Sequence, residues 1–168
     1  MAAGDITYTT SSSLTLTGLV SLASGGYWGS AAIDFTTGHY QDAHVGGKIV
    51  VNGTIAADGY IAVFAYGSYD GTTMTAGLNN VTLPGAITWG TNTGVLSYQD
   101  LRYLGSAQVD DTDDGDTVEF GPFSLAAAFG MFLPEKAGIV IYNATGAALD
   151  ETGSGNEIVW NGIKIAAA

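Results

Sequence analysis

Apolar and polar residues alternate along most of this chain, and helical periodicity is hard to find. The apolar stretches are short, and several end at dipeptides such as Asn52-Gly53 and Asp58-Gly59, which tolerate positive φ. Glycine supplies 25 of the 168 residues, about twice its usual share, so much of the backbone must turn or bulge. This pattern favours short strands joined by tight turns over helices.

Two expected strands, residues 60–69 and 138–142, are apolar on both faces, which is typical of strands buried between two layers. The segments 48–51 and 60–66 are predicted to pair with each other across the intervening turns. Further strands are expected at residues 14–20, 79–83, 86–89, 100–109, 117–125 and 157–165, the last with a bulge at Asn161-Gly162.

Roughly eight to ten short strands separated by regular turn signals predict an all-β fold. An antiparallel β-sandwich, jelly-roll-like in topology, is favoured because two stacked sheets bury both strand faces and protect strand edges. At most one short helix is expected, near residues 126–132, where alanines precede the helix-ending Pro134. The chain is predicted to form a single domain over residues 1–168, with residues 1–13 as an extended N-terminal arm.

The charge of the chain excludes several classes of function. Four Lys and Arg residues stand against sixteen Asp and Glu residues, which gives a formal net charge of −12. The basic residues are spread along the sequence, so no basic patch is available for nucleic acid. No segment approaches the ~20 apolar residues of a membrane span, and the first residues lack the positive charge of a secretory signal. We therefore expect a soluble protein, made in a host cytoplasm, that binds neither nucleic acid nor membrane.

Candidate catalytic and metal-binding groups are few. His39 and His44 would point to opposite faces of an alternating strand, and no cysteine completes a zinc set. The acidic run Asp110–Asp116 has oxygen ligands for calcium, but the twelfth position from Asp110 is Gly121, where a bidentate glutamate is required. This run is therefore predicted to be a solvated turn. No serine lies in a nucleophile-elbow motif, so we predict no enzyme, no cofactor and no metal site.

Aromatic residues are the remaining candidates for binding. Aromatic side chains at alternating positions mostly fill cores or subunit interfaces, although exposed ones stack on sugar rings in carbohydrate-binding β-sandwich modules. Tyr27 and Trp28, which lie in a glycine-rich segment, are predicted to contact a partner, and so is Trp160. The full candidate set is Tyr27, Trp28, Phe35, Tyr40, Tyr66, Tyr69, Trp89, Tyr98, Tyr103 and Trp160.

Three stretches of the sequence carry a resemblance to a known group of proteins. They are Ser21-Leu-Ala-Ser24 with Ala32-Ile-Asp-Phe-Thr-Thr37 and Asp42-Ala43; Val63-Phe-Ala-Tyr-Gly-Ser-Tyr-Asp-Gly-Thr72; and residues 123–150, which include Gly138-Ile-Val-Ile-Tyr-Asn143. Together they span about residues 21–150 and resemble small virion structural proteins of tailed bacteriophages, usually encoded among head and tail genes. These motifs are turn-and-strand patterns, so no functional residue is carried over from the group.

The resemblance implies a capsid accessory protein of the cement or decoration kind, bound to the outer surface of the phage head with the major capsid protein as its partner. The acidic charge agrees with this place, because an acidic exterior protein avoids packaged DNA. The alternative that stays open is a carbohydrate- or host-binding β-sandwich module on the tail or fibre. A third hypothesis, a hydrolytic enzyme, would need paired carboxylates in a pocket. The aromatic surplus and common capsid symmetry also predict a homo-oligomer, with a trimer favoured.

Overall fold

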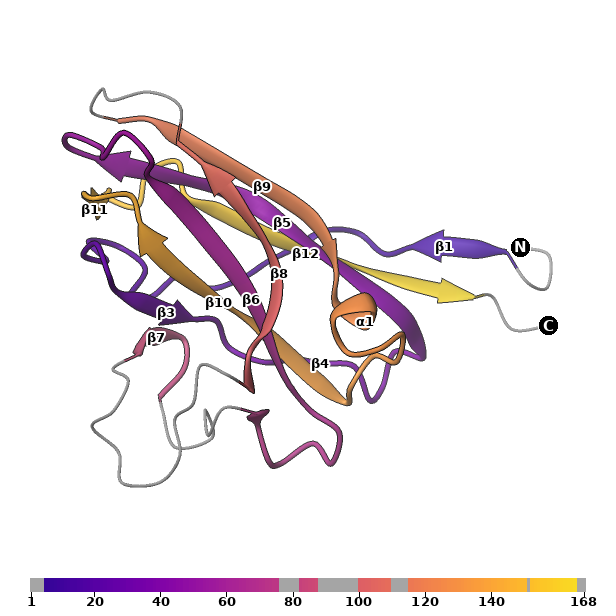
Figure 1. Cartoon of the computed structure of the whole chain (residues 1–168). Helices are drawn as coiled ribbons and strands as arrows, with labels where there is room; N and C mark the ends of the chain where they lie inside the picture. The colour runs from indigo at the N-terminus through magenta and orange to yellow at the C-terminus, as the bar shows by residue number, and fades with distance from the viewer. Residues whose placement is uncertain (1–4, 76–81, 88–99, 110–114, 151, 166–168) are drawn as a thin grey trace.

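The computed structural model describes residues 5–75, 82–87, 100–109, 115–150 and 152–165, and its strands form two antiparallel sheets that face each other (Figure 1). The first sheet contains β1 (Ile6–Tyr8), β2 (Ser12–Ser13), β5 (Tyr40–Asn52), β9 (Thr117–Ser124), β11 (Ala148–Leu149) and β12 (Glu157–Ile165). The second contains β3 (Tyr27–Gly29), β4 (Ile33–Asp34), β6 (Tyr60–Ser68), β7 (Gly85–Ile87), β8 (Arg102–Gln108) and β10 (Lys136–Ala144). Among the described residues, α1 (Leu125–Ala128) is the one helix. The predicted all-β antiparallel sandwich with one short helix is confirmed.

The main core lies between the two sheets. Strand β6 contributes Ile61, Val63 and Ala65, and the adjacent strand β10 contributes Ile139 and Ile141. All five side chains are fully buried, as the apolar runs in both segments predict. The two strands pair without interruption from end to end, so they form the rigid centre of the second sheet.

A smaller apolar cluster covers the outer face of the second sheet. It contains Tyr66 from β6 and Val140 from β10, packed with Ile87 and Leu101. The Tyr66 hydroxyl donates a hydrogen bond to the Ser30 carbonyl at 2.7 Å, and burial of the ring raises the pKa of that hydroxyl. Strand β6 is therefore covered on both faces, which explains why both of its alternating sets are apolar.

The pairing predicted between residues 48–51 and 60–66 is wrong. Strand β5, which contains the first segment, pairs with β9, β11 and β12, whereas β6 pairs with β8 and β10. The chain crosses from one sheet to the other between Asn52 and Tyr60. The physical reason is that each strand is long and internal, so it needs neighbours on both of its edges, and those neighbours come from later in the sequence.

Two further local predictions need correction. Residues 14–20 form no strand. Leu19 is buried and lies in a turn, in which its N–H donates to the Leu16 carbonyl at 2.9 Å. The predicted bulge at Asn161-Gly162 is not found; the register of β12 with β5 shifts between Ile163 and Lys164, where the unpaired residue is Gln41 of β5. Gly162 has another role, because a Cβ atom there would overlap the ring of Tyr40. Predicted strand 79–83 falls largely outside the described residues, as does the end of predicted strand 86–89.

Three aspartates shape turns in the same way. Each is followed two residues later by a threonine whose backbone N–H donates to the aspartate side chain: Asp34 with Thr36, Asp70 with Thr72, and Asp150 with Thr152. Asp70 also accepts bonds from the Thr73 N–H at 2.7 Å and the Ser68 hydroxyl at 2.7 Å. The carboxylates thereby replace missing backbone partners, so part of the acidic composition is structural.

These hydrogen bonds predict acid sensitivity. The bonds from Thr73, Ser68 and Thr72 hold the pKa of Asp70 well below its usual value, and those from Thr36 and Thr152 lower the pKa of Asp34 and Asp150. A depressed folded-state pKa adds stability above the unfolded pKa, near 4, and this stability is lost as pH falls toward the folded pKa. We expect a steady Tm from pH 7 to about 5 and a decline below about pH 4. Asp70→Asn should make the acid decline shallower, and an unchanged slope would contradict this account.

Candidate interaction surfaces

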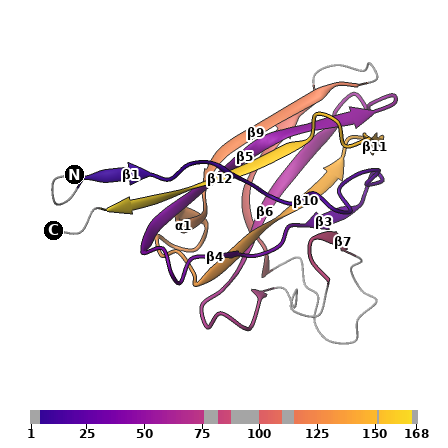
Figure 2. The same cartoon turned by 180° about the vertical axis from the view of Figure 1, so that it is seen from behind.

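An arm projects from one end of the sandwich. Strand β1 pairs with the end of β12, and the two strands extend together at one end of the sandwich in both views (Figure 2). The register places Ile6 opposite Ile165 and Tyr8 opposite Ile163, so these four side chains share one face. Ile6 and Tyr8 are both 66% exposed. On the other side of β12, Ile163 and Lys164 also pair with Asp42 and Tyr40 of β5. We call residues 6–8 with 163–165 the arm ribbon.

A second exposed apolar feature follows α1. The Gly130 N–H donates to the Ala127 carbonyl at 3.3 Å and the Met131 N–H donates to the Ala126 carbonyl at 2.8 Å, which is the bonding of a Schellman helix end. Gly130 and Met131 have φ values of +77° and +76°. The residue at the position of Met131 commonly packs back on its helix, but here both Met131 and Phe132 are 75% exposed. We call Met131 and Phe132 the apolar turn.

One carboxylate fixes this region to the first sheet. Oδ1 of Asp42, on β5, accepts from the Ala126 N–H at 2.8 Å, and its Oδ2 accepts from the Ser124 hydroxyl at 2.6 Å. His44 Nε2 lies 3.4 Å from the same Oδ2. Serine, aspartate and histidine thus meet here, but the serine hydroxyl donates to the carboxylate instead of to the imidazole. This arrangement anchors the N-terminus of α1 and does not activate a nucleophile.

The outer face of the second sheet carries a row of aromatic rings. Tyr27 on β3 stacks on Tyr142 of β10 with ring centroids 4.5 Å apart, and Tyr60 of β6 meets the same Tyr142 edge to face at 6.3 Å. Farther along, Phe64 meets Tyr103 of β8 at 5.6 Å. Tyr60 is 40% exposed and Tyr103 is 60% exposed. We call these five residues the aromatic strip.

The three residues predicted at contacts have different environments. Trp28 is fully buried in the main core and its Nε1 donates to the Thr17 carbonyl at 2.9 Å, so the prediction that it contacts a partner is wrong. Its glycine-rich neighbours indicated an exposed loop, but residues 27–29 pair with both β10 and β7. Tyr27 points to the opposite face and is half-buried. Trp160 is half-buried against Phe35, and its contact with a partner stays a prediction.

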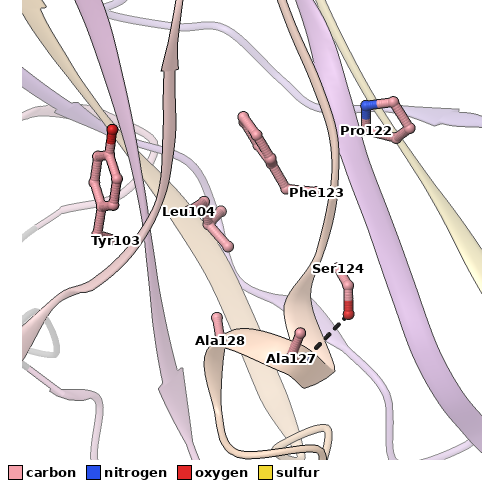
Figure 3. A pocket seen from close by; sticks show the side chains of 7 residues that line it. All are labelled: Tyr103, Leu104, Pro122, Phe123, Ser124, Ala127 and Ala128. Carbon is pink, nitrogen blue, oxygen red and sulfur yellow. Dashed lines mark hydrogen bonds between the residues drawn. The ribbon is translucent and has the colours of Figure 1, made fainter.

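A shallow pocket lies between the edge strands β8 and β9, beside α1 (Figure 3). Its volume is about 320 Å³, and Leu104, Phe123 and Ala128 are among the side chains that line it. The Ser124 hydroxyl at its rim is engaged by Asp42 and by the Ala127 N–H, so it is not available as a nucleophile. The pocket has room for an apolar side chain and brings no acid–base pair together.

Other candidates from the sequence give no site in the described part of the chain. Within residues 5–75, 82–87, 100–109, 115–150 and 152–165, no three His, Cys, Asp or Glu side chains are grouped to hold a metal ion. Residues 110–114 of the predicted acidic turn lie outside the described residues, and so do Trp89 and Tyr98. Within those ranges, no helix has the length and apolar character that crossing a membrane requires.

Comparison with known proteins finds no matching family model, no curated relative and no matching solved structure.

Proposed function

We propose that this chain is a structural accessory subunit of a tailed-phage virion, of the cement or decoration kind, that binds the outer surface of the head. Its partner is the major capsid protein, and it stabilises the shell without catalysing a reaction. The sequence resemblance over about residues 21–150 supports this proposal. The observation that most strongly supports the proposal is the exposure of Met131 and Phe132 in the apolar turn.

The apolar turn has the properties of a docking anchor. A left-handed backbone is unfavourable by about 1–2 kcal/mol for a residue other than glycine, so the exposed position of Met131 is held at a cost. Asp42 fixes the adjacent helix to β5, so Met131 and Phe132 are presented on a rigid support. Exposed apolar side chains on a rigid element are typical of the central anchors of protein interfaces. In Figures 1 and 2, α1 lies near the end of the sandwich from which the arm ribbon projects.

A comparison of particles with and without the protein tests the proposal. Each copy adds interface area between neighbouring capsid subunits. Many modest contacts of this kind together stabilise the shell against the outward pressure of the packaged DNA. Particles lacking the protein should assemble but release DNA at a lower temperature, and added purified protein should restore their resistance. DNA release can be followed by the fluorescence of an intercalating dye during heating. Equal heat resistance of both particles would contradict the proposal.

A second candidate function, carbohydrate binding at the host surface, is favoured by the aromatic strip. Sugar rings stack on aromatic faces, and Tyr60 and Tyr103 expose part of their rings on adjacent strands of one sheet. Ser106 adds a polar group, since its hydroxyl accepts a bond from the Tyr103 hydroxyl at 3.0 Å. This arrangement matches the row of aromatics that a carbohydrate-binding module requires.

A glycan array probed with the purified protein tests this second candidate. Tyr60→Ala and Tyr103→Ala should each weaken binding roughly tenfold if sugars stack on the strip. Tyr69→Ala is the matched control, because Tyr69 is also exposed but contacts Phe129 outside the strip. An array without signal for the parent protein, or equal losses in all three variants, would exclude the strip as a sugar site.

A further inference from the structure

Among the described residues, no strand pairs with the outer edge of β1, the outermost strand of the first sheet. Strand β1 is the last in the order β1-β12-β5, and the Thr9 N–H just after it donates to the Gly162 carbonyl of β12 at 2.8 Å. Backbone groups alternate along an antiparallel strand, so Thr7 also directs its N–H and C=O toward β12. Ile6 and Tyr8 therefore direct theirs to the opposite side, away from the sheet.

We propose that this edge binds the same edge of a second copy of the chain. The two β1 strands run antiparallel, with Ile6 of each copy opposite Tyr8 of the other and Thr7 opposite Thr7 on a twofold axis. This register pairs all the outward backbone groups of Ile6 and Tyr8 within β1 and forms four N–H···O=C bonds. If the register of the two β1 strands were shifted by two residues, half of the outward N–H and C=O groups of Ile6 and Tyr8 would have to pair with residues outside β1. The inference goes beyond the proposed function, because the pairing requires no capsid.

The side chains favour a second copy over another extended strand. In this register the exposed Ile6 of one copy lies beside Tyr8 of the other. Four apolar side chains then form a row across the two sheets: Ile165 and Ile6 of the first copy, followed by Tyr8 and Ile163 of the second copy. The twofold axis generates an identical row that runs in the opposite direction. A twofold interface matches itself by symmetry, whereas a foreign strand would need its own apolar pair at the same spacing. The threonine pair on the opposite face is also a favourable cross-strand combination.

The charge of the chain does not prevent this association. Each copy carries a formal charge of −12, which opposes contact between the bodies. Strand β1 itself has no charged side chain, and it lies at one end of the sandwich (Figures 1 and 2). Repulsion is screened over about 8 Å at physiological ionic strength, so the dimer should strengthen with added salt. A twofold dimer closes on itself, so for the free protein it replaces the trimer predicted from the sequence.

Disulfide trapping tests the register. The chain has no cysteine, so Thr7→Cys introduces one thiol per copy. The two Thr7 Cα atoms would be about 4.5 Å apart as a non-hydrogen-bonded pair, which lies within the range of a disulfide. Mild oxidation should convert most of this variant to a covalent dimer that dithiothreitol reverses. Asp5→Cys is the control, because the two Asp5 positions would be about 13 Å apart. Absence of the Thr7→Cys dimer, or equal yields in both variants, would overturn the proposal.

Sedimentation of the unmodified protein provides a second measurement. At micromolar concentration the mass should approach that of a dimer as salt is raised, and Ile6→Ser combined with Tyr8→Ser should remain monomeric. Both side chains are largely exposed in the single chain, so this variant should fold normally. A monomer at all salt concentrations, a trimer, or a variant that dimerises like the parent would each overturn the pairing. These results do not depend on phage particles, so they are separate from the test of the proposed function.

Discussion

Replacing Trp28 with alanine is expected to lower the free energy of unfolding by about 3–5 kcal/mol. The side chain is fully buried in the main core, on the inner face of β3, so its removal leaves a large cavity between the sheets. The lost hydrogen bond should matter less, because Thr17, whose carbonyl accepts from Nε1, is exposed and can bind water instead. Cavity formation therefore dominates the expected loss.

Urea unfolding of Trp28→Ala and Tyr27→Ala measures this difference. The two residues are neighbours on one strand, but Tyr27 points to the outer face and is half-buried. Its truncation should lower the unfolding midpoint less than that of Trp28, with the denaturant slope unchanged in both variants. A Trp28→Ala protein as stable as the parent, or equal losses in both variants, would mean that β3 does not face the core as described.

The central strands could be predicted from the sequence because the apolar composition of each segment by itself indicates that the strand is buried. Residues 60–66 and 138–142 are apolar at consecutive positions, and only a strand covered on both faces tolerates that pattern. The boundaries of β12 were also predictable, since alternation continues from Glu157 to Ile165. The short helix was predicted from its alanines and Pro134, and the structure ends it at Ala128.

Pairing between strands was not predictable in the same way. Turn dipeptides after Val51 and before Tyr60 indicate where the chain changes direction, but they do not specify which sheet receives the next strand. That choice depends on later strands, chiefly β9, β10 and β12, which supply the neighbours of β5 and β6. The place of Trp28 depends in turn on β10, because pairing with it converts a glycine-rich segment into an internal strand.

The candidate contact surfaces illustrate a second limit of sequence reasoning. Met131 and Phe132 were expected to lie in or at the end of the short helix near residues 126–132. Gly130 is the signal that was available, since glycine commonly ends a helix in the left-handed conformation. Local pattern does not reveal that Met131 adopts a positive φ as well, which turns its side chain to solvent. Exposure of an apolar residue is set by the whole fold.

The apolar turn should supply most of the affinity for the head if the proposed function is correct. Met131→Ser combined with Phe132→Ser is expected to weaken binding to heads stripped of this protein by about 100-fold or more, because central apolar anchors often contribute at least ~2 kcal/mol each. Stability should change little, since both side chains are mainly in solvent and the Schellman bonds of Gly130 and Met131 use backbone atoms. Cosedimentation of the purified variant with stripped heads measures the affinity, and urea unfolding confirms the fold.

Tyr103→Ser is the matched control for this experiment, because it also removes a largely exposed aromatic ring but lies on the outer face of the second sheet. Its affinity for stripped heads should remain within about threefold of the parent, since a peripheral or uninvolved residue contributes less than about 0.7 kcal/mol. The reverse pattern, with Tyr103→Ser weak and the Met131/Phe132 variant unaffected, would place the capsid contact on the aromatic strip. Parent-like binding by both variants would contradict docking through the apolar turn, and the carbohydrate-binding candidate would then be favoured if Tyr103→Ser also lost glycan binding.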